Sequence, residues 1–277
     1  MQNPHDLAVR FRALHEAKDP FVIPNVWDGG SAAVMAGLGF KALATSSSAC
    51  AATLGRLDGG ITREQALEHA GLIAQLSPIP VSADLENGFG DSPESAAETI
   101  RLAAATGLVG GSIEDSSRDA RTPIYAMEHA IERVAAAVAA ARRLPFPFTL
   151  TARAENFVNG RPDLDDTVRR LQAFERAGAD VLFAPGLPDL AAVRTVCSAL
   201  TKPFNFMVGI PGKSFTVAEL GAAGVKRISL STTLYRAAMT GLLAAAREVK
   251  ESGTFSYLET LVGGEQLGQD LRRPARS

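Results

Sequence analysis

Two acidic residues follow a short apolar run near the middle of the chain. Asp84 and Glu86 are separated by one residue, and Gly88 and Gly90 come shortly after them. Because side chains alternate along a strand, both carboxylates are expected to face one spot where the strand ends. Converging carboxylates repel each other unless a cation or a proton lies between them. The spacing predicts a site for a hard divalent ion such as Mg²⁺, which prefers oxygen ligands; the alternative is a solvated acidic turn.

Other charged and hydroxyl residues follow neighbouring strand-like segments. Glu114 ends one such segment, Asp58 lies in a loop after another, and Arg153 is a cation at a strand end. Arginine offers a planar fork to a carboxylate or phosphate. An acidic metal site that faces Arg153 and the serines Ser46 and Ser47 suits a small chelating anion, such as an α-keto acid or an enolate. The alternative is that Glu114 and Arg153 form a structural pair at the rim.

Strand-like and helix-like segments alternate along the whole chain. The expected strands are Phe21–Pro24, Lys41–Thr45, Val81–Asp84, Val109–Glu114, Thr149–Ala152, Val181–Ala184, Pro203–Val208 and Arg227–Leu230. The expected helices are Ala32–Leu38, Arg63–Leu76, Pro93–Thr106, Met127–Arg143, Leu164–Ala177, Leu190–Leu200, Val217–Ala223 and Leu234–Val249. Eight strands, each followed by a helix, predict an α/β fold with a single (β/α)₈ TIM-type barrel domain over residues 1–277, including a C-terminal tail from about residue 253.

The distribution of polar residues favours a barrel over a doubly wound sheet. A doubly wound sheet binds its ligand at one switch point. Here polar or charged residues follow nearly every strand, as they do in barrel enzymes, where chemistry sits at the C-terminal strand ends. The histidines fall in helical segments instead and are expected at the surface: His5, His15, His69 and His129.

The composition limits the classes of protein to which this chain can belong. Hydrophobic residues make up 46% and charged residues 21% of the 277 positions, which is usual for a globular chain. A net charge of −2 gives no electrostatic reason to expect a nucleic acid or an anionic membrane as partner. No segment offers about 20 uninterrupted apolar residues, and the polar segment Met1–Arg12 lacks a signal-peptide core. With Cys50 and Cys197 far apart, a reduced, cytoplasmic protein is expected.

Several motifs together resemble the isocitrate lyase/phosphoenolpyruvate mutase superfamily, including its phosphonomutase-like branch. The resemblance extends from residue 24 to about residue 236 and rests on five groups: Pro24–Asp28, Thr45–Ser47, Leu54-Gly55 with Asp58, Asp84–Gly90, and Ser112–Asp115 with Thr151–Glu155. It implies a (β/α)₈ barrel whose last helix is swapped between the subunits of a homodimer or homotetramer. It also implies Mg²⁺ or Mn²⁺ as cofactor and a small carboxylate with an α-oxyanion as substrate.

The resemblance also implies roles for individual residues. Asp84 is the expected direct metal ligand, and Asp58, Glu86 and Glu114 act mainly through metal-bound water. Catalysis is expected from Arg153, Asp58 and Glu114. The expected substrate-binding residues are Trp27, Ser46, Ser47, Arg153 and Asn205.

The loop after the fourth strand departs from the pattern of the family. The lyase branches carry a cysteine in this loop and the mutases a lysine and an asparagine, whereas the segment Asp115–Pro123 has none of these. We therefore expect a Mg²⁺-dependent lyase-like enzyme that acts on a small α-keto or α-hydroxy carboxylate through an enolate, by oxaloacetate-type decarboxylation or C–C cleavage. The alternatives are P–C or P–O chemistry on a phosphonate or phosphoenolpyruvate, and a barrel that binds a carboxylate without turnover.

Two further expectations concern mobile or exposed parts of the chain. The polar loop Asp115–Ile124 is expected to gate the site, with Arg118 or Arg121 helping to hold the substrate. The apolar segment Gly253–Leu258 follows the last helix and is not needed to cover one barrel. Apolar surface of this kind usually meets a partner, which favours a homodimer or homotetramer.

Overall fold

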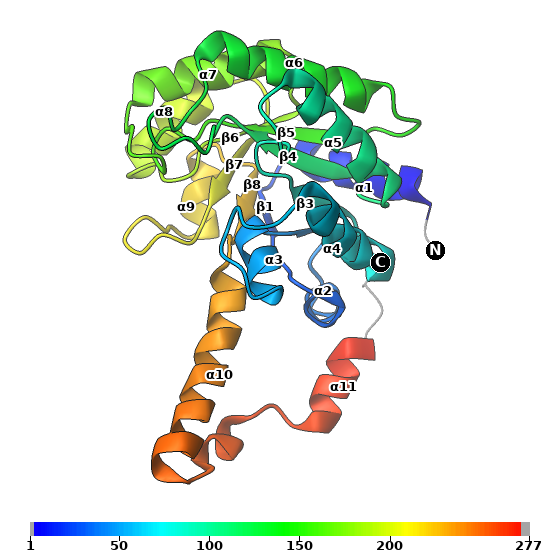
Figure 1. Ribbon diagram of the computed structural model, residues 1–277, viewed down its shortest axis with the longest axis vertical. Helices are drawn as coiled ribbons and strands as arrows, with labels where there is room; N and C mark the ends of the chain where they lie inside the picture. The colour runs from blue at the N-terminus through cyan, green and yellow to red at the C-terminus, as the bar shows by residue number, and fades with distance from the viewer. Residues whose placement is uncertain (1–2, 273–277) are drawn as a thin grey trace.

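Eight parallel strands close into a barrel, which confirms the predicted (β/α)₈ fold (Figure 1). The computed structural model describes residues 3–272. Neighbouring strands follow the order β1-β8-β7-β6-β5-β4-β3-β2, and a parallel bridge between Asn25 and Ala44 joins the β1 and β2 ends. The strands are β1 (Phe21–Ile23), β2 (Leu43–Ala44), β3 (Val81–Asp84), β4 (Gly110–Glu114), β5 (Thr149–Arg153), β6 (Val181–Phe183), β7 (Phe204–Met207) and β8 (Arg227–Ser229).

Helices surround the barrel and begin and end largely where the sequence predicted. Ser92 caps α5 through its side chain and Pro93 is the first helical residue, while Gly107, φ 97°, follows the helix end. The helices are α1 (Pro4–Glu16), α2 (Gly29–Gly37), α3 (Ser47–Thr53), α4 (Arg63–Leu76), α5 (Pro93–Ala105), α6 (Met127–Arg142), α7 (Leu164–Arg176), α8 (Leu190–Ser198), α9 (Val217–Ala222), α10 (Thr233–Ser252), the 3₁₀ helix η1 (Ser256–Thr260) and α11 (Gly264–Arg272).

Some elements differ from the prediction. β2 is shorter than Lys41–Thr45, and α10 is longer than Leu234–Val249. Helices α1, α3, α11 and η1 were not expected. Helix α3 forms because the Ser46 hydroxyl accepts a hydrogen bond from the Ala49 amide and caps a run of small residues that otherwise reads as a loop.

Helix α1 covers the N-terminal end of the barrel. Phe11 packs so closely on β4 that a Cβ added to Gly110 would lie 2.7 Å from the Phe11 ring. His15, from the same helix, is buried between the rings of Phe11 and Phe21, with ring centroids 4.8 and 5.0 Å apart. The expectation that His15 lies at the surface was therefore wrong, because nothing local in the sequence shows that α1 folds under the strands.

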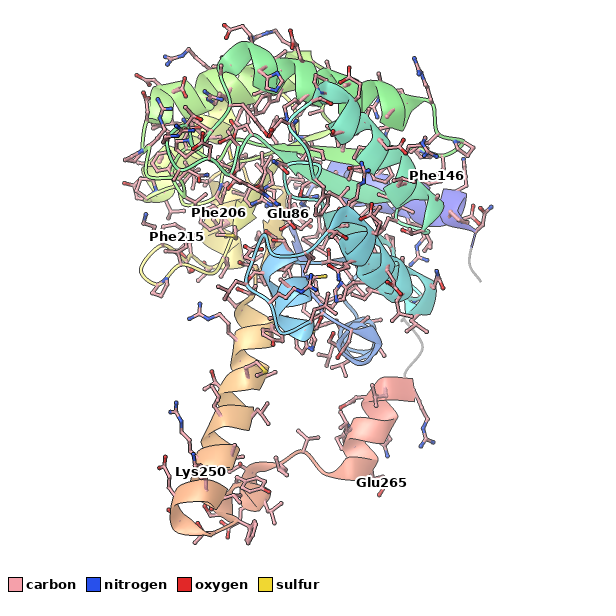
Figure 2. All side chains as sticks on the ribbon, viewed as in Figure 1. Glu86, Phe146, Phe206, Phe215, Lys250 and Glu265 are labelled. Atoms are coloured by element: carbon pink, nitrogen blue, oxygen red, sulfur yellow. The ribbon has the colours of Figure 1, made fainter. Side chains whose placement is uncertain are left out.

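Helix α10 leaves the barrel, and its side chains stand clear of it as far as Lys250 (Figure 2). None of its residues is buried. The chain then turns back, and α11 lies against α2. Residues 273–277 of the expected tail lie outside the described residues. Within residues 3–272, no helix combines the length and hydropathy needed to cross a membrane.

The burial of His15 predicts a loss of stability in mild acid. Burial, with a smaller effect from the charge of Arg227, lowers the pKa of His15 to about 3. The unfolded chain takes up this proton near pH 6.5 and the folded chain does not, so stability falls as the pH drops below about 6.5. Between about pH 7.5 and pH 5, His15 alone should account for about 2 kcal/mol of the unfolding free energy.

Chemical denaturation of wild type and His15→Gln at both pH values checks this expectation. The variant should be less stable at the higher pH but lose about 2 kcal/mol less than wild type on acidification. His5→Gln, an exposed position on the same helix, is the control and should keep the wild-type loss. Equal losses in wild type and His15→Gln would contradict the assignment.

Candidate active site

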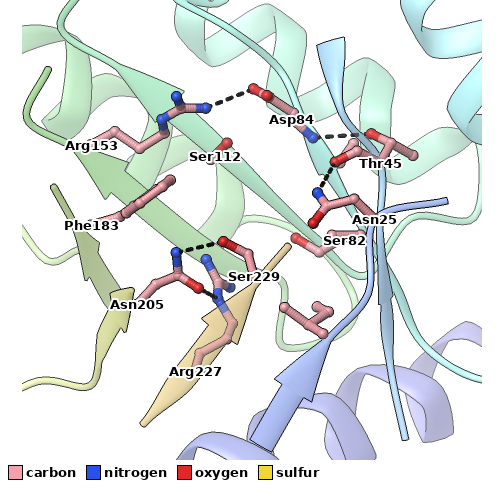
Figure 3. Close-up of a pocket in the computed structure, with 13 residues that line it drawn as sticks. Asn25, Thr45, Ser82, Asp84, Ser112, Arg153, Phe183, Asn205, Arg227 and Ser229 are labelled. Atoms are coloured by element: carbon pink, nitrogen blue, oxygen red, sulfur yellow. Dashed lines mark hydrogen bonds and ion pairs between the residues drawn. The ribbon is translucent and has the colours of Figure 1, made fainter. Parts of the chain in front are cut away.

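One guanidinium gathers three carboxylates at the C-terminal ends of the strands. Arg153, the last residue of β5, pairs through Nη1 with Asp84 (2.9 Å), through Nη2 with Glu114 (3.3 Å) and through Nε with Glu155 (2.9 Å). Its guanidinium also lies over the Phe183 ring, 4.9 Å from the centroid. The Asp84 contact crosses the barrel interior in Figure 3. The structure thus contains the rim pair of Glu114 and Arg153 and joins it to two further acids.

The local charge balance is negative. Burial raises the pKa of Glu114 well above its ordinary value, against the influence of Arg153, and the other acids raise it further. The pKa of Glu155 is raised mainly by burial as well. Burial opposes the charge of Arg153, but its three acidic partners outweigh burial and raise its pKa. Three carboxylates therefore share one cation, and a further positive charge would relieve their repulsion.

Asp84 is held from several sides. Its backbone amide donates to Thr45 Oγ1 (3.1 Å), and its carboxylate accepts from the Ser47 amide at Oδ2 (3.4 Å). The Oδ1 atom also accepts from the Glu86 amide (3.2 Å). One backbone N–H group from the start of α3, that of Ser47, thus reaches the Asp84 carboxylate. The Asp84 side chain is therefore fixed in place before any ligand binds.

Glu86 faces a different part of the site from Asp84. Strand β3 ends at Asp84, and Glu86 has a left-handed backbone with φ 51°, so strand alternation does not extend to it. Its carboxylate pairs with Arg118 of the loop after β4, and its other oxygen, Oε1, is buried without a hydrogen-bond partner among the described residues. Through this ion pair, the Arg118 side chain lies beside the acidic residues of the site.

An outer pocket of about 390 Å³ opens above this charge cluster. Its lining brings the exposed Asp58 together with the other acids of the site. The residues that line it are Ser47, Asp58, Gly59, Glu86, Glu114, Ser116, Arg118, Arg153 and Glu155. Most of the predicted metal and substrate residues therefore border one pocket.

The other predicted residues lie elsewhere. Ser46 is occupied as the cap of α3, and the Trp27 ring packs edge-on against Tyr235, with centroids 5.5 Å apart. Asn205 lies deeper in the barrel, where its Oδ1 accepts from Arg227 Nε (2.8 Å). The described lining of the outer pocket includes none of these three predicted side chains, and Asp84 lines the cavity inside the barrel instead.

Two arginines from outer helices hold the loops that carry the acids. Arg133 of α6 is buried, stacks on Tyr125 at 4.5 Å, and donates to the carbonyl oxygens of Asn87, Gly90, Asp91 and Ser92. Arg170 of α7 pairs with Asp115 (3.0 Å), whose other oxygen accepts from the Glu155 amide (2.8 Å). Burial raises the pKa of Asp115 to about 6 even though Arg170 opposes the shift. These contacts fix the loop after β3 and the residue that follows Glu114.

Sequence reasoning omitted Glu155 and Arg133 from the site. Glu155 lies two residues beyond Arg153, and its position just after a strand end was the available signal. Arg133 had no such signal, because a charged residue in a helix is usually solvated. Its role depends on the packing of α6 against the loop after β3.

The donor set suits a hard divalent ion, although no group of three or more His, Cys, Asp or Glu side chains within residues 3–272 is already arranged around one point. The acids carry surplus negative charge, and the buried Glu86 Oε1 has no partner in the described chain. Arg153 and Arg118 presently occupy several of the carboxylates. The residues therefore fit such an ion best with few direct protein ligands and several water ligands.

Comparison with known proteins identifies the family. The model of the phosphoenolpyruvate phosphomutase family matches residues 11–250. A crystal structure of a candidate lyase/mutase from Burkholderia cenocepacia superposes with a TM-score of 0.95 at 49% identity, covering 98% of this chain and 97% of that chain. The structure of 2,3-dimethylmalate lyase, a member of the PEP mutase/isocitrate lyase superfamily, gives a TM-score of 0.86 at 28% identity, with 98% and 95% covered.

The curated relatives also match over most of this chain and over most of their own length. An uncharacterised protein of Mycobacterium tuberculosis is 32% identical over 87% of this chain and 89% of its own. An oxaloacetate decarboxylase of Ectopseudomonas mendocina is 27% identical over 88% of this chain and 84% of its own. With the barrel, the acidic strand ends and a family match over most of its length, the chain belongs to the isocitrate lyase/phosphoenolpyruvate mutase superfamily, whose members depend on a divalent metal.

Proposed function

We propose that this protein is a Mg²⁺-dependent lyase that decarboxylates or cleaves a small α-keto carboxylate of the oxaloacetate type. The observation that carries the proposal is the Arg153 cluster beside an acid-lined pocket of about 390 Å³. A metal-binding carboxylate and a fixed guanidinium together suit a ligand that chelates through its keto acid end and carries a second anionic group. The relatives that act on oxaloacetate-type substrates agree with this chemistry.

The metal would be held mainly by Asp84, with Glu86, Glu114 and Asp58 reached through water. When bound there, a divalent cation supplies electrophilic stabilisation of the negative charge that develops on an enolate oxygen. Mg²⁺ fits because it keeps several waters and accepts one or two carboxylates. The Ser47 amide, which already points at Asp84, would help to orient the carboxylate of the substrate.

The side chains of the pocket favour decarboxylation over aldol-type cleavage. The described lining contains no His, Cys or Lys, so its candidate bases are carboxylates, and Glu86, Glu114 and Glu155 among them are paired with arginines. Neither Cys nor Lys occurs in Asp115–Pro123. Cleaving a C–C bond next to a hydroxyl requires a base to remove its proton, whereas loss of CO₂ from a β-keto acid requires mainly stabilisation of the enolate. Glu114, whose buried carboxyl has a raised pKa, would return a proton to the enolate carbon.

A second candidate function is phosphorus–carbon chemistry on a phosphonate. The observation in its favour is Arg118, which lines the outer pocket together with Arg153 and could meet a phosphoryl group after releasing Glu86. Two guanidinium groups are a usual environment for a phosphonate. Binding of a carboxylate without turnover is the remaining alternative.

A small substrate panel tests the proposal. With Mg²⁺ present, we expect release of pyruvate and CO₂ from oxaloacetate above the background rate, and no phosphate from phosphonopyruvate or phosphoenolpyruvate. Phosphate release would favour the second candidate, while metal-dependent binding with no product from any substrate would indicate a binding protein.

The metal site is tested on the same preparations. Asp84→Ala should abolish Mg²⁺ binding in calorimetry and lose pyruvate release, and Asp84→Asn should weaken both, because the anionic oxygen ligand is gone. Asp165→Ala, at an exposed position on α7, should behave as wild type. Unchanged Mg²⁺ affinity in Asp84→Ala would remove the metal-site proposal.

Variants of Arg153 distinguish a role in substrate binding from a purely structural role. If it clamps an anionic group of the substrate, Arg153→Ala should lower kcat/KM by about a hundredfold to several thousandfold, as expected for on the order of 3–5 kcal/mol. Arg153→Lys should recover only part of this loss, since the charge remains but the fork is lost.

Melting temperature and turnover should be measured together on these variants. Arg153→Ala should also melt earlier, because Asp84, Glu114 and Glu155 lose their common partner. A destabilised alanine variant that keeps the wild-type kcat/KM per folded molecule would leave Arg153 with the structural role alone. Arg142→Ala, which removes an arginine paired with Asp180 outside the site, is the matched control.

We further propose that α10 packs on a second copy of the chain, as a swapped helix in a homodimer or homotetramer. No residue of α10 is buried, and Leu242 and Leu243 are 58% and 49% exposed. The apolar surface continues beyond the helix through Phe255, Leu258, Leu261 and Val262. Large exposed apolar patches of this kind mark association surfaces.

Light scattering at micromolar concentration should give at least twice the 29.1 kDa of one chain. Leu242→Glu with Leu243→Glu should shift the protein toward monomer, because each carboxylate would be buried at the interface. Lys250→Glu, at the exposed end of the same helix, is the control for added charge. A monomeric wild type would refute this assembly.

A further inference from the structure

A cavity of about 50 Å³ lies inside the barrel, lined in part by the Asp84–Arg153 pair of the site (Figure 3). Polar side chains from five of the eight strands face it, together with Asn25 and Thr45 just after β1 and β2, which is unusual for the packed interior of a barrel. Its lining includes Ser82, Asp84, Ser112, Asn205, Arg227 and Ser229. The proposed chemistry of the outer pocket makes no use of its deepest side chain, Arg227.

Arg227 is a buried cation without an acidic partner among the residues that the structure describes. It begins β8, is 6% exposed, and donates through Nε to Asn205 Oδ1 (2.8 Å). Its Nη1 atom is buried and has no hydrogen-bond partner within residues 3–272. No carboxylate of the described chain pairs with it, and the nearest acid on the cavity wall, Asp84, is engaged by Arg153.

Apart from the Asp84 carboxylate, which Arg153 engages, the polar side chains around the cavity can act as hydrogen-bond donors. Asn205 Nδ2 donates to Ser229 Oγ (3.1 Å), which leaves the Ser229 hydroxyl proton free to point into the cavity. Ser82 and Ser112 add two more hydroxyl groups. A guanidinium edge surrounded by hydroxyl donors is a site for an anion, since every donor then meets an acceptor.

The electrostatics also call for negative charge here. Burial, and to a lesser extent the charge of Arg153, lowers the pKa of Arg227 to about 9, and the charge of Arg227 in turn lowers the pKa of His15 beneath it. A buried charge that lacks a partner is costly to keep in a folded protein. The acids of the outer site lie around Arg153 and do not pair with Arg227.

We propose that this cavity binds one small monovalent anion of the chloride class, held by the guanidinium of Arg227 and the Ser229 hydroxyl. The volume suits this occupant, because about 50 Å³ has room for only a few water-sized groups. The Asp84 carboxylate on the same wall disfavours a dianion such as phosphate. The anion would neutralise the barrel interior one layer below the substrate pocket.

Bromide is the probe of choice. Melting temperatures of the full chain should rise with sodium bromide over the low-millimolar range and saturate, while sodium gluconate, which is too large for the cavity, should have little effect at equal sodium concentration. Arg227→Met keeps the length of the side chain and should reduce the apparent bromide affinity about tenfold or more, because a charge-assisted hydrogen bond is lost. Ser229→Ala is a milder change and should weaken bromide binding severalfold.

Arg142→Met is the matched control, because Arg142 pairs with Asp180 outside the barrel. It should keep the wild-type difference between bromide and gluconate. If Arg227→Met does not fold, Ser229→Ala and a crystal grown with bromide decide the question. An anomalous peak inside the cavity beside the Arg227 guanidinium supports the proposal. Equal effects of bromide and gluconate on wild type, an unchanged bromide response in the folded variants, or bromide found only on the protein surface would overturn it.

Discussion

The pairing of Arg153 with Asp84, Glu114 and Glu155 is the constraint on which the functional end of the barrel depends. The partners come from β3, β4 and the residues after β5, so the cluster can form only where adjacent parallel strands end together. Buried charges are tolerated only when they are paired, and each member here would be costly without the others. The ion pairs that stabilise the rim of the barrel therefore also bring together the charged groups that are proposed to bind the metal and the substrate.

Other arginines hold the loops that surround this cluster. Arg133 and Arg170 reach from α6 and α7 over the loops that follow β3 and β4, and they satisfy carbonyl and carboxylate oxygens that would otherwise be buried without donors. The helices thus pack against the sheet and also fix the loops in which Glu86 and Asp115 lie. Arg118 differs, because it comes from the loop itself and holds Glu86 by one ion pair, so its contact can be exchanged for a ligand.

The parts of the site that the sequence predicted are those set by local geometry. Asp84, Glu114 and Arg153 each end a strand, and the barrel topology then brings them together. Residues whose roles arise from packing were missed: His15 is buried because α1 folds under the barrel, and no local pattern records that contact. Left-handed geometry at Glu86 was also unpredictable, because a glutamate in that conformation is uncommon.

The two interior arginines show how one barrel can give similar residues different environments. Arg153 ends its strand and has more acid around it than it can neutralise, whereas Arg227 begins its strand and pairs with no acid of the described chain. The charge of Arg153 nevertheless contributes to the lowered pKa of Arg227, so the two are electrostatically linked through the interior. A negative charge between them would favour both cations. Beneath the site, the barrel interior therefore contains polar and charged side chains and is not a purely apolar core.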